Sequence, residues 1–146
     1  MLHMRRDERR RRRPYNRMMT IAASRVGLVL FAHGARDPRW AEPFERLRQK
    51  VESARPDTPV RLAYLELMAP DLESAVTELI GTGCRSVRVV PIFLGQGGHV
   101  RQDLPALAQT VAARHPEVTI DLVQAVGEND AVLDGIAAVC IAGLPA

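Results

Sequence analysis

The sequence predicts a single α/β domain built on a four-stranded parallel sheet of strand order 2-1-3-4, with helices on both faces. Three observations support this prediction. Apolar runs of strand length alternate with segments of helical periodicity from residue 26 onward. The connections are short, as in right-handed βαβ crossovers. The 146 residues suffice for one hydrophobic core and are too few for two domains.

The first strand is expected over residues 26–32, VGLVLFA, because a run without polar residues is typical of a central parallel strand that is buried on both faces. Asp37 and Pro38 then offer an N-cap and a first-turn proline for a helix. The expected inward stripe has helical spacing and consists of Trp40, Phe44, Leu47 and Val51.

The second strand is expected over residues 60–67, with Arg61 in its middle indicating an edge position. The dipeptide Pro70-Asp71 opens the second helix, and Gly81 and Gly83 close it.

The third strand is expected over residues 86–94, and the third helix follows over 101–114. The fourth strand, residues 118–126, carries Asp121 and is therefore placed at the other edge. Asn129 is the expected N-cap of a last helix. The order 2-1-3-4 places strands 2 and 4 at the edges and the apolar first strand in the interior of the sheet. It has a topological switch point between strands 1 and 3.

The formal net charge of +3 comes from the start of the chain. Residues 1–17 carry eight arginines against Asp7 and Glu8, whereas the rest carries twelve basic and fifteen acidic residues. We interpret residues 1–25 as a basic leader, either disordered or the product of a misassigned start, and residues 26–146 as the domain. The alternative is an arginine-rich tether to nucleic acid or to a membrane.

Several classes of protein are excluded by composition. The leader has no apolar segment of the kind found in secretory signals, and no apolar run approaches the roughly 20 residues that cross a bilayer. The two cysteines, Cys84 and Cys140, lie outside any C-x-x-C spacing, which argues against a zinc knuckle or a redox dithiol. We therefore expect a cytoplasmic protein with no membrane partner and no nucleic-acid partner.

Two histidines and a carboxylate are placed at the carboxyl ends of neighbouring strands. His33 directly follows the first strand, His99 follows the third by a few residues, and Glu66 ends the second. Ligands of open α/β sheets bind at this edge, near the switch point. Imidazole and carboxylate suit divalent cobalt, nickel, iron and zinc, and two or three ligands leave coordination positions open. Histidine, with an ordinary pKa of about 6.5, is also suited to accept protons at neutral pH.

Each of these residues has a simpler explanation. His33 and His99 are, taken singly, hydrogen-bonding loop residues, and Glu66 is an ordinary strand-end carboxylate. We assign no function to His115, at a helix C-terminus, or to His3, in the leader.

Glycines and arginines flank the same edge. The glycines before the third helix can form a backbone nest for an anion or admit a flat ring, and they are Gly95, Gly97 and Gly98. Three arginines lie near this edge: Arg36, Arg39 and Arg101. Each can pair with a substrate carboxylate or remain solvated at a helix start. We predict substrate binding by Gly34, Arg36, Gly97, Gly98 and Arg101.

Three blocks of sequence, LVLFAHGARDP, YLELMAPDL and VVPIFLGQGGHVRQDLP, resemble the small sirohydrochlorin metal chelatases in order and spacing. That family includes anaerobic cobaltochelatases of cobalamin synthesis and ferrochelatases of siroheme synthesis. The resemblance covers residues 26–126 and implies a lyase-class enzyme with its cleft at the carboxyl edge of the sheet. It implies Co²⁺ or Fe²⁺, or in a related pathway Ni²⁺, as a substrate, with no tightly bound cofactor.

The resemblance also implies residue roles: His33 and His99 bind the metal and accept protons, and Glu66 assists. Short members of the family resemble one half of a longer tandem form and pair as homodimers, so a homodimer is expected. The arginine-rich start departs from the typical short member. Two alternatives stay open, a non-catalytic carrier of metal or tetrapyrrole and a phosphoryl-transfer enzyme with His33 as nucleophile.

Overall fold

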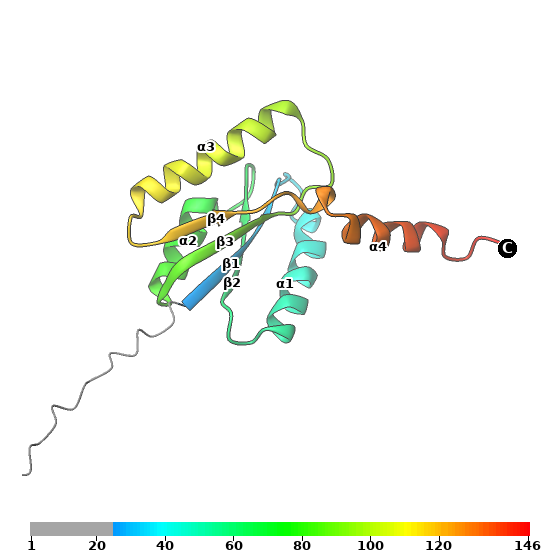
Figure 1. The fold of residues 1–146 in the computed structure, drawn as a ribbon, viewed down its shortest axis with the longest axis horizontal. Coiled ribbons are helices and arrows are strands. Elements are labelled where there is room, and N and C mark those ends of the chain that lie inside the picture. Colours follow the sequence, from blue (N-terminus) through cyan, green and yellow to red (C-terminus); the bar gives the residue numbers. More distant parts are fainter. Residues whose placement is uncertain (1–24) are drawn as a thin grey trace, which may run out of the picture.

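In the computed structural model, which describes residues 25–146, four strands form one parallel sheet in the predicted order 2-1-3-4 (Figure 1). From one edge to the other the strands are β2 (Val60–Tyr64), β1 (Arg25–Ala32), β3 (Cys84–Pro91) and β4 (Thr119–Leu122). The helical segments are η1 (Pro38–Ala41), α1 (Glu42–Ala54), α2 (Leu72–Gly81), α3 (Gly98–Arg114), η2 (Val126–Glu128) and α4 (Asp130–Ile141). The predicted leader lies outside the described residues except for Arg25, which opens β1, and the division of the chain at residue 25 stays a prediction.

Helices cover both faces of the sheet, as predicted. The 3-10 turn η1 and helix α1 pack on one face through the predicted stripe, Trp40 of η1 with Phe44, Leu47 and Val51 of α1, against Leu30, Leu62 and Tyr64. Helices α2 and α3 cover the other face over a larger cluster that includes Val29, Phe31, Val76, Leu79, Val89 and Val111. Successive side chains of a strand point to opposite faces, so β1 supplies both clusters, and its second half, from Val29 to Ala32, is buried throughout.

The two mid-strand charges lie at the sheet edges, where they find partners. Arg61 of β2 donates to Glu78 of α2 over 2.8 Å. Asp121 of β4 accepts from Arg88 of β3 over 3.0 Å. Both residues keep their charges near solvent, which confirms the reasoning that placed β2 and β4 at the edges.

The strands end earlier than the sequence pattern indicates. Strand β2 stops at Tyr64 rather than at residue 67, because the chain turns through Leu67, whose φ is +62°. Strand β3 stops at Pro91 rather than at residue 94, and β4 stops at Leu122 rather than at 126. Beyond these points the apolar residues line loops at the carboxyl edge instead of extending the sheet.

Two helix starts also differ from expectation. Asp37 caps the 3-10 turn η1 by accepting from the backbone N–H of Arg39 over 3.0 Å. Helix α1 begins only after this turn, at Glu42 rather than at Pro38. Helix α3 begins at Gly98 rather than at residue 101, so that His99 belongs to its first turn.

The last helix has its predicted cap but not a core position. Asn129 accepts from the backbone N–H of Ala131 over 2.9 Å, which confirms it as the N-cap of α4. The helix projects away from the sheet and buries no residue (Figure 1). Between residues 25 and 146, no helix combines the length and apolar character that crossing a bilayer requires.

Candidate functional site

The carboxyl ends of β1 and β2 bring His33 and Glu66 together. The Nε2 atom of His33 lies 3.1 Å from Oε1 of Glu66. The backbone supports the same contact, because the N–H of Glu66 donates to the carbonyl of His33 over 3.1 Å. The two side chains are 47% and 55% exposed, so the pair is open to a ligand from solvent. The structure thus places two of the three predicted metal-site residues in direct contact.

Gly34 makes this contact possible. Its φ is +97°, a left-handed conformation that L side chains rarely adopt. A Cβ atom at this position would overlap the carbonyl oxygen of Glu66. Gly34 is buried, so its clearest role is to let the loop after β1 lie against the loop after β2, and substrate binding by this residue stays a prediction.

Phe93, which the sequence reasoning assigned to the interior of a strand, packs against the imidazole of His33. The two ring centroids are 5.9 Å apart in an edge-on arrangement. Phe93 is buried and also contacts Phe31 of β1, with centroids 6.2 Å apart. The aromatic ring therefore limits the orientations open to His33. The sequence did not predict the contact of Phe93 with His33, because it follows from β3 ending at Pro91, before Phe93.

His99 lies apart from the pair. It occupies the first turn of α3 with an exposed side chain. Within the described part of the chain, no three His, Cys, Asp or Glu side chains come close enough to form a metal cluster. The structure brings His33 to Glu66 and leaves His99 apart from them, in the first turn of α3, so the metal-binding role of His99 stays a prediction.

The glycine-rich segment that leads into α3 is open. A Cβ atom added at Gly95, Gly97 or Gly98 would meet nothing within 4 Å. None of these glycines has a left-handed φ, so neither backbone conformation nor packing within the chain requires a glycine there. Their absence of side chains leaves the backbone before α3 accessible, as a flat ligand requires.

The three candidate arginines differ in the ion pairs that they form within the described chain. Arg39 donates to both carboxylate oxygens of Asp37, with a shortest distance of 2.7 Å. Hydrogen bonds from the Arg39 side chain and backbone N–H hold the pKa of Asp37 below its ordinary value. Arg101 pairs with Glu128 over 3.3 Å. Arg36 is exposed and forms no ion pair with another residue between 25 and 146.

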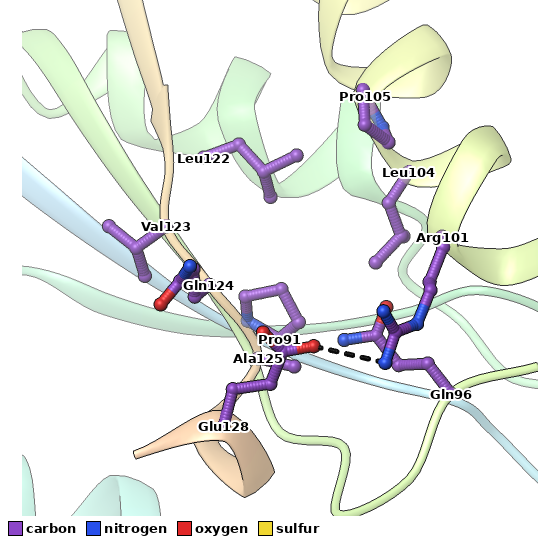
Figure 2. A pocket seen from close by; sticks show the side chains of 10 residues that line it. All are labelled: Pro91, Gln96, Arg101, Leu104, Pro105, Leu122, Val123, Gln124, Ala125 and Glu128. Carbon is purple, nitrogen blue, oxygen red and sulfur yellow. Dashed lines mark ion pairs between the residues drawn. The ribbon is translucent and has the colours of Figure 1, made fainter.

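A pocket of about 250 Å³ lies beside Arg101, between α3 and the ends of β3 and β4 (Figure 2). Figure 2 shows Arg101 reaching from α3 toward Glu128 of η2. Apolar and amide side chains complete the lining, among them Leu104, Leu122, Gln96 and Gln124. The sequence reasoning found Arg101 but missed Glu128, because no strand or helix pattern marks a residue of η2 as part of this edge.

Gly127 is a second glycine that packs directly on the backbone of another loop, and the sequence reasoning missed it. Its N–H donates to the carbonyl of Phe93 over 2.9 Å, and a Cβ atom would overlap the carbonyl oxygen of Leu94. Gly127 thus lets the loop after β4 pack against the loop after β3, as Gly34 lets the loops after β1 and β2 pack together. An isolated glycine after a predicted strand was the available signal.

The geometry of the His33–Glu66 pair is suited to one divalent cation. Metal–ligand bonds of about 2.1 Å to Nε2 and to Oε1, across their 3.1 Å separation, would subtend an angle of about 95° at the metal. That angle is close to the right angle of adjacent ligands in an octahedral complex. Two protein ligands leave the remaining positions open for exchange, as expected of a site through which a metal passes.

The chain is similar to curated proteins named sirohydrochlorin cobaltochelatase. It is 29% identical over 83 residues to the sirohydrochlorin cobaltochelatase of Methanosarcina acetivorans, covering 57% of this chain and 64% of the relative. It is 33% identical over 88 residues to the sirohydrochlorin cobaltochelatase of Methanocaldococcus jannaschii, covering 60% of this chain and 62% of the relative. The chain thus covers less than two thirds of the length of these two relatives.

Solved structures share the fold. The cobalamin (vitamin B12) biosynthesis CbiX protein from Marinobacter aquaeolei VT8 superposes with a TM-score of 0.71 at 36% identity, over 79% of this chain and 93% of that one. SirB from Bacillus subtilis with Fe³⁺ superposes with a TM-score of 0.70 at 21% identity, over 83% of this chain and 48% of that one, a likeness of fold alone. The family model described as CbiX matches residues 27–139, most of the chain, and the chain belongs to the CbiX family.

Proposed function

We propose that this chain is a lyase-class chelatase that inserts a divalent metal ion, Co²⁺ or Fe²⁺ or in a related pathway Ni²⁺, into a tetrapyrrole of the sirohydrochlorin type. The reaction belongs to cobalamin or siroheme biosynthesis. The observation that carries the proposal is the contact of His33 with Glu66 over 3.1 Å at the carboxyl edge of the sheet. The names of the cobaltochelatase relatives support it.

The pair has two tasks in this reaction. The imidazole and the carboxylate hold the incoming cation while its water ligands are replaced by pyrrole nitrogens. The macrocycle must also lose two N–H protons as the dication enters, so that its net charge is unchanged. His33 is the proposed acceptor of a proton, because neutral imidazole is a base at neutral pH. Glu66 compensates the imidazolium charge that forms.

The open segment that leads into α3 is the proposed binding site of the tetrapyrrole ring. Gly97 and Gly98 leave the backbone bare there, and His99 in the first turn of α3 supplies a second imidazole to the metal or to a proton. Arg36 and Arg101 are the proposed partners of substrate carboxylates. Arg101 would exchange Glu128 for a substrate carboxylate. Both side chains are exposed, so breaking their ion pair costs little free energy.

The proposal extends to the state of the protein. We infer a cytoplasmic homodimer without a resident cofactor, in which a second copy supplies the opposite wall of the cleft. A tetrapyrrole is wide for one four-stranded module, and the pair and the open segment are exposed in the single chain. The wall supplied by a second copy would exclude water from the reacting face.

The test is the absorbance change of sirohydrochlorin on addition of Co²⁺, Fe²⁺ or Ni²⁺, with and without protein. We expect protein-dependent insertion, with the double variant His33→Ala/His99→Ala reduced to the rate without protein. A protein that binds the tetrapyrrole or the metal tightly without raising the insertion rate would be a carrier, and the chelatase proposal would be wrong.

A further inference from the structure

Helix α4 exposes an apolar surface that no other helix or strand of the described structure covers. Four of its large apolar side chains are between 40% and 76% exposed: Leu133, Ile136, Val139 and Ile141. Leu144, just beyond the helix, is 66% exposed. The only charged residues in the helix are Asp130 and Asp134. A helix of 12 residues is marginal in water by itself, and an apolar helix is stable where it is buried. This helix therefore needs a partner.

The base of α4 is fixed in a direction that leads away from its own sheet. Gly127 is held to Phe93 by a hydrogen bond of 2.9 Å and packs directly on the backbone of Leu94. Asn129 caps the helix immediately afterwards, and Glu128 is paired with Arg101. The helix consequently leaves the domain at the carboxyl edge and extends outward (Figure 1).

The sheet has an uncovered area on the α1 face. Leu28 and Leu30 of β1 point toward α1, and they are paired in register with Arg88 and Val90 of β3, so those side chains point to the same face. Helix α1 covers β1 and β2 there and leaves β3 and β4 open. In a doubly wound fold this area is where a second helix would lie beside α1.

Two hollows follow this open area. One, of about 520 Å³, is lined by Arg88, Val90 and Val123 together with the start of α4. The other, of about 280 Å³, is lined by Val26, Leu28, Val51, Arg55 and Arg88. Val26 is 50% exposed. The charged residues lining the second hollow are both arginines, whereas those of α4 are both acidic.

We propose that two copies of this chain exchange their α4 helices, each helix packing on the open α1 face of β3 and β4 in the other copy. A second copy is the occupant that fits, because one chain carries both the uncovered helix and the uncovered sheet, and a two-fold axis covers both pairs at once. Twelve helical residues span about 18 Å and the eight residues of β3 about 26 Å, so the helix fits along the strand. The acidic residues of α4 would face Arg55 and Arg88.

The first test is sedimentation equilibrium of the full chain at micromolar concentrations. We expect the wild type to have twice the 16.1 kDa mass of the chain, and Ile136→Asp/Val139→Asp to be monomeric. The matched control is Gln109→Asp/Ala113→Asp, which adds the same two charges at exposed positions of α3 and should leave the dimer intact. Circular dichroism checks that each variant is folded. A wild type that is monomeric at every concentration, or an α4 variant that remains dimeric, overturns the proposal.

The second test distinguishes exchange from any other dimer and uses the native thiols, since Cys140 in α4 is exposed and Cys84 is buried. Chains with Cys140→Ser and one of Val26→Cys, Thr119→Cys or Val123→Cys are mixed with wild type and oxidised. Exchange predicts a disulfide from Cys140 of one copy to at least one of these positions on the other. A dimer that forms no such disulfide overturns the exchange. The proposal concerns assembly alone, and an exchanged dimer that inserts no metal would contradict only the proposed function.

Discussion

Gly34 packs so closely on the backbone of Glu66 that an added Cβ atom would overlap the Glu66 carbonyl oxygen. This contact sets the distance between the loops after β1 and β2. The imidazole of His33 and the carboxylate of Glu66 extend from these loops toward one another. The spacing of the candidate metal pair thus depends on a glycine that itself carries no chemistry.

Gly34→Ala should therefore lose both stability and the His33–Glu66 spacing. The positive φ alone costs a non-glycine residue about 1–3 kcal/mol, and the overlap with Glu66 adds to that cost. Urea unfolding and metal insertion measure the two effects. Gly98→Ala is the matched control and should unfold at the wild-type urea concentration or slightly above it, because its Cβ atom meets nothing within 4 Å. Equal stability of Gly34→Ala and wild type would contradict the close packing of Gly34 on the Glu66 backbone.

Much of the fold follows from the sequence because each inference used a local signal. Arg61 and Asp121 marked the edge strands, and the order of the sheet followed from them. The contact of His33 with Glu66 was foreseeable because the carboxyl ends of neighbouring parallel strands meet at one edge. Asn129 was foreseeable as a cap from its residue type and position.

What the sequence could not provide depends on contacts between distant segments. Strand-like alternation continues through the loops after β2 and β3, so Phe93 seemed to belong to a strand instead of packing against His33. The contacts of Gly127 and Glu128 with the loop after β3 and with α3 have no periodic signature. Helical spacing predicted α4 but not that its apolar residues would be exposed in a single chain.

Arg101→Gln should weaken substrate binding without lowering stability. The Arg101–Glu128 pair is 62% and 39% exposed, and pairs of this kind contribute about 0–1 kcal/mol to folding. We expect a higher KM for sirohydrochlorin with urea unfolding near that of wild type. Arg114→Gln is the matched control, since it removes a similarly exposed pair with Glu73 at the other end of α3. An unchanged KM in the Arg101 variant would remove Arg101 from the proposed substrate contacts.

Asp71 should make the stability of the protein depend on pH. It caps α2 by accepting from the backbone N–H of Ser74 over 2.8 Å, and hydrogen bonding by the Ser74 side chain and backbone lowers the pKa of Asp71. A lowered pKa in the folded state gives stability that is present above the unfolded value of about 3.9 and is lost as the pH falls through the folded value.

Asp71→Ala should therefore cost about 1 kcal/mol at pH 7, and less at pH 3. Urea unfolding at the two pH values measures the difference. Asp71→Asn, which keeps a capping oxygen but cannot titrate, should be close to wild type at pH 7. A cost of Asp71→Ala that is the same at both pH values would show that the charge of this cap does not contribute.

The measurement that tests the central claim most directly is the initial rate of Co²⁺ insertion into sirohydrochlorin by His33→Ala, beside wild type and His115→Ala. His115 lies at the C-terminus of α3, where it contacts Glu73, and serves as the matched histidine control. If His33 binds the metal and accepts a proton, its loss should lower the rate on the order of 100-fold or more. The His115 variant should keep most of the wild-type rate. A His33 variant as fast as wild type would contradict the assignment of the His33–Glu66 pair as the site of metal insertion.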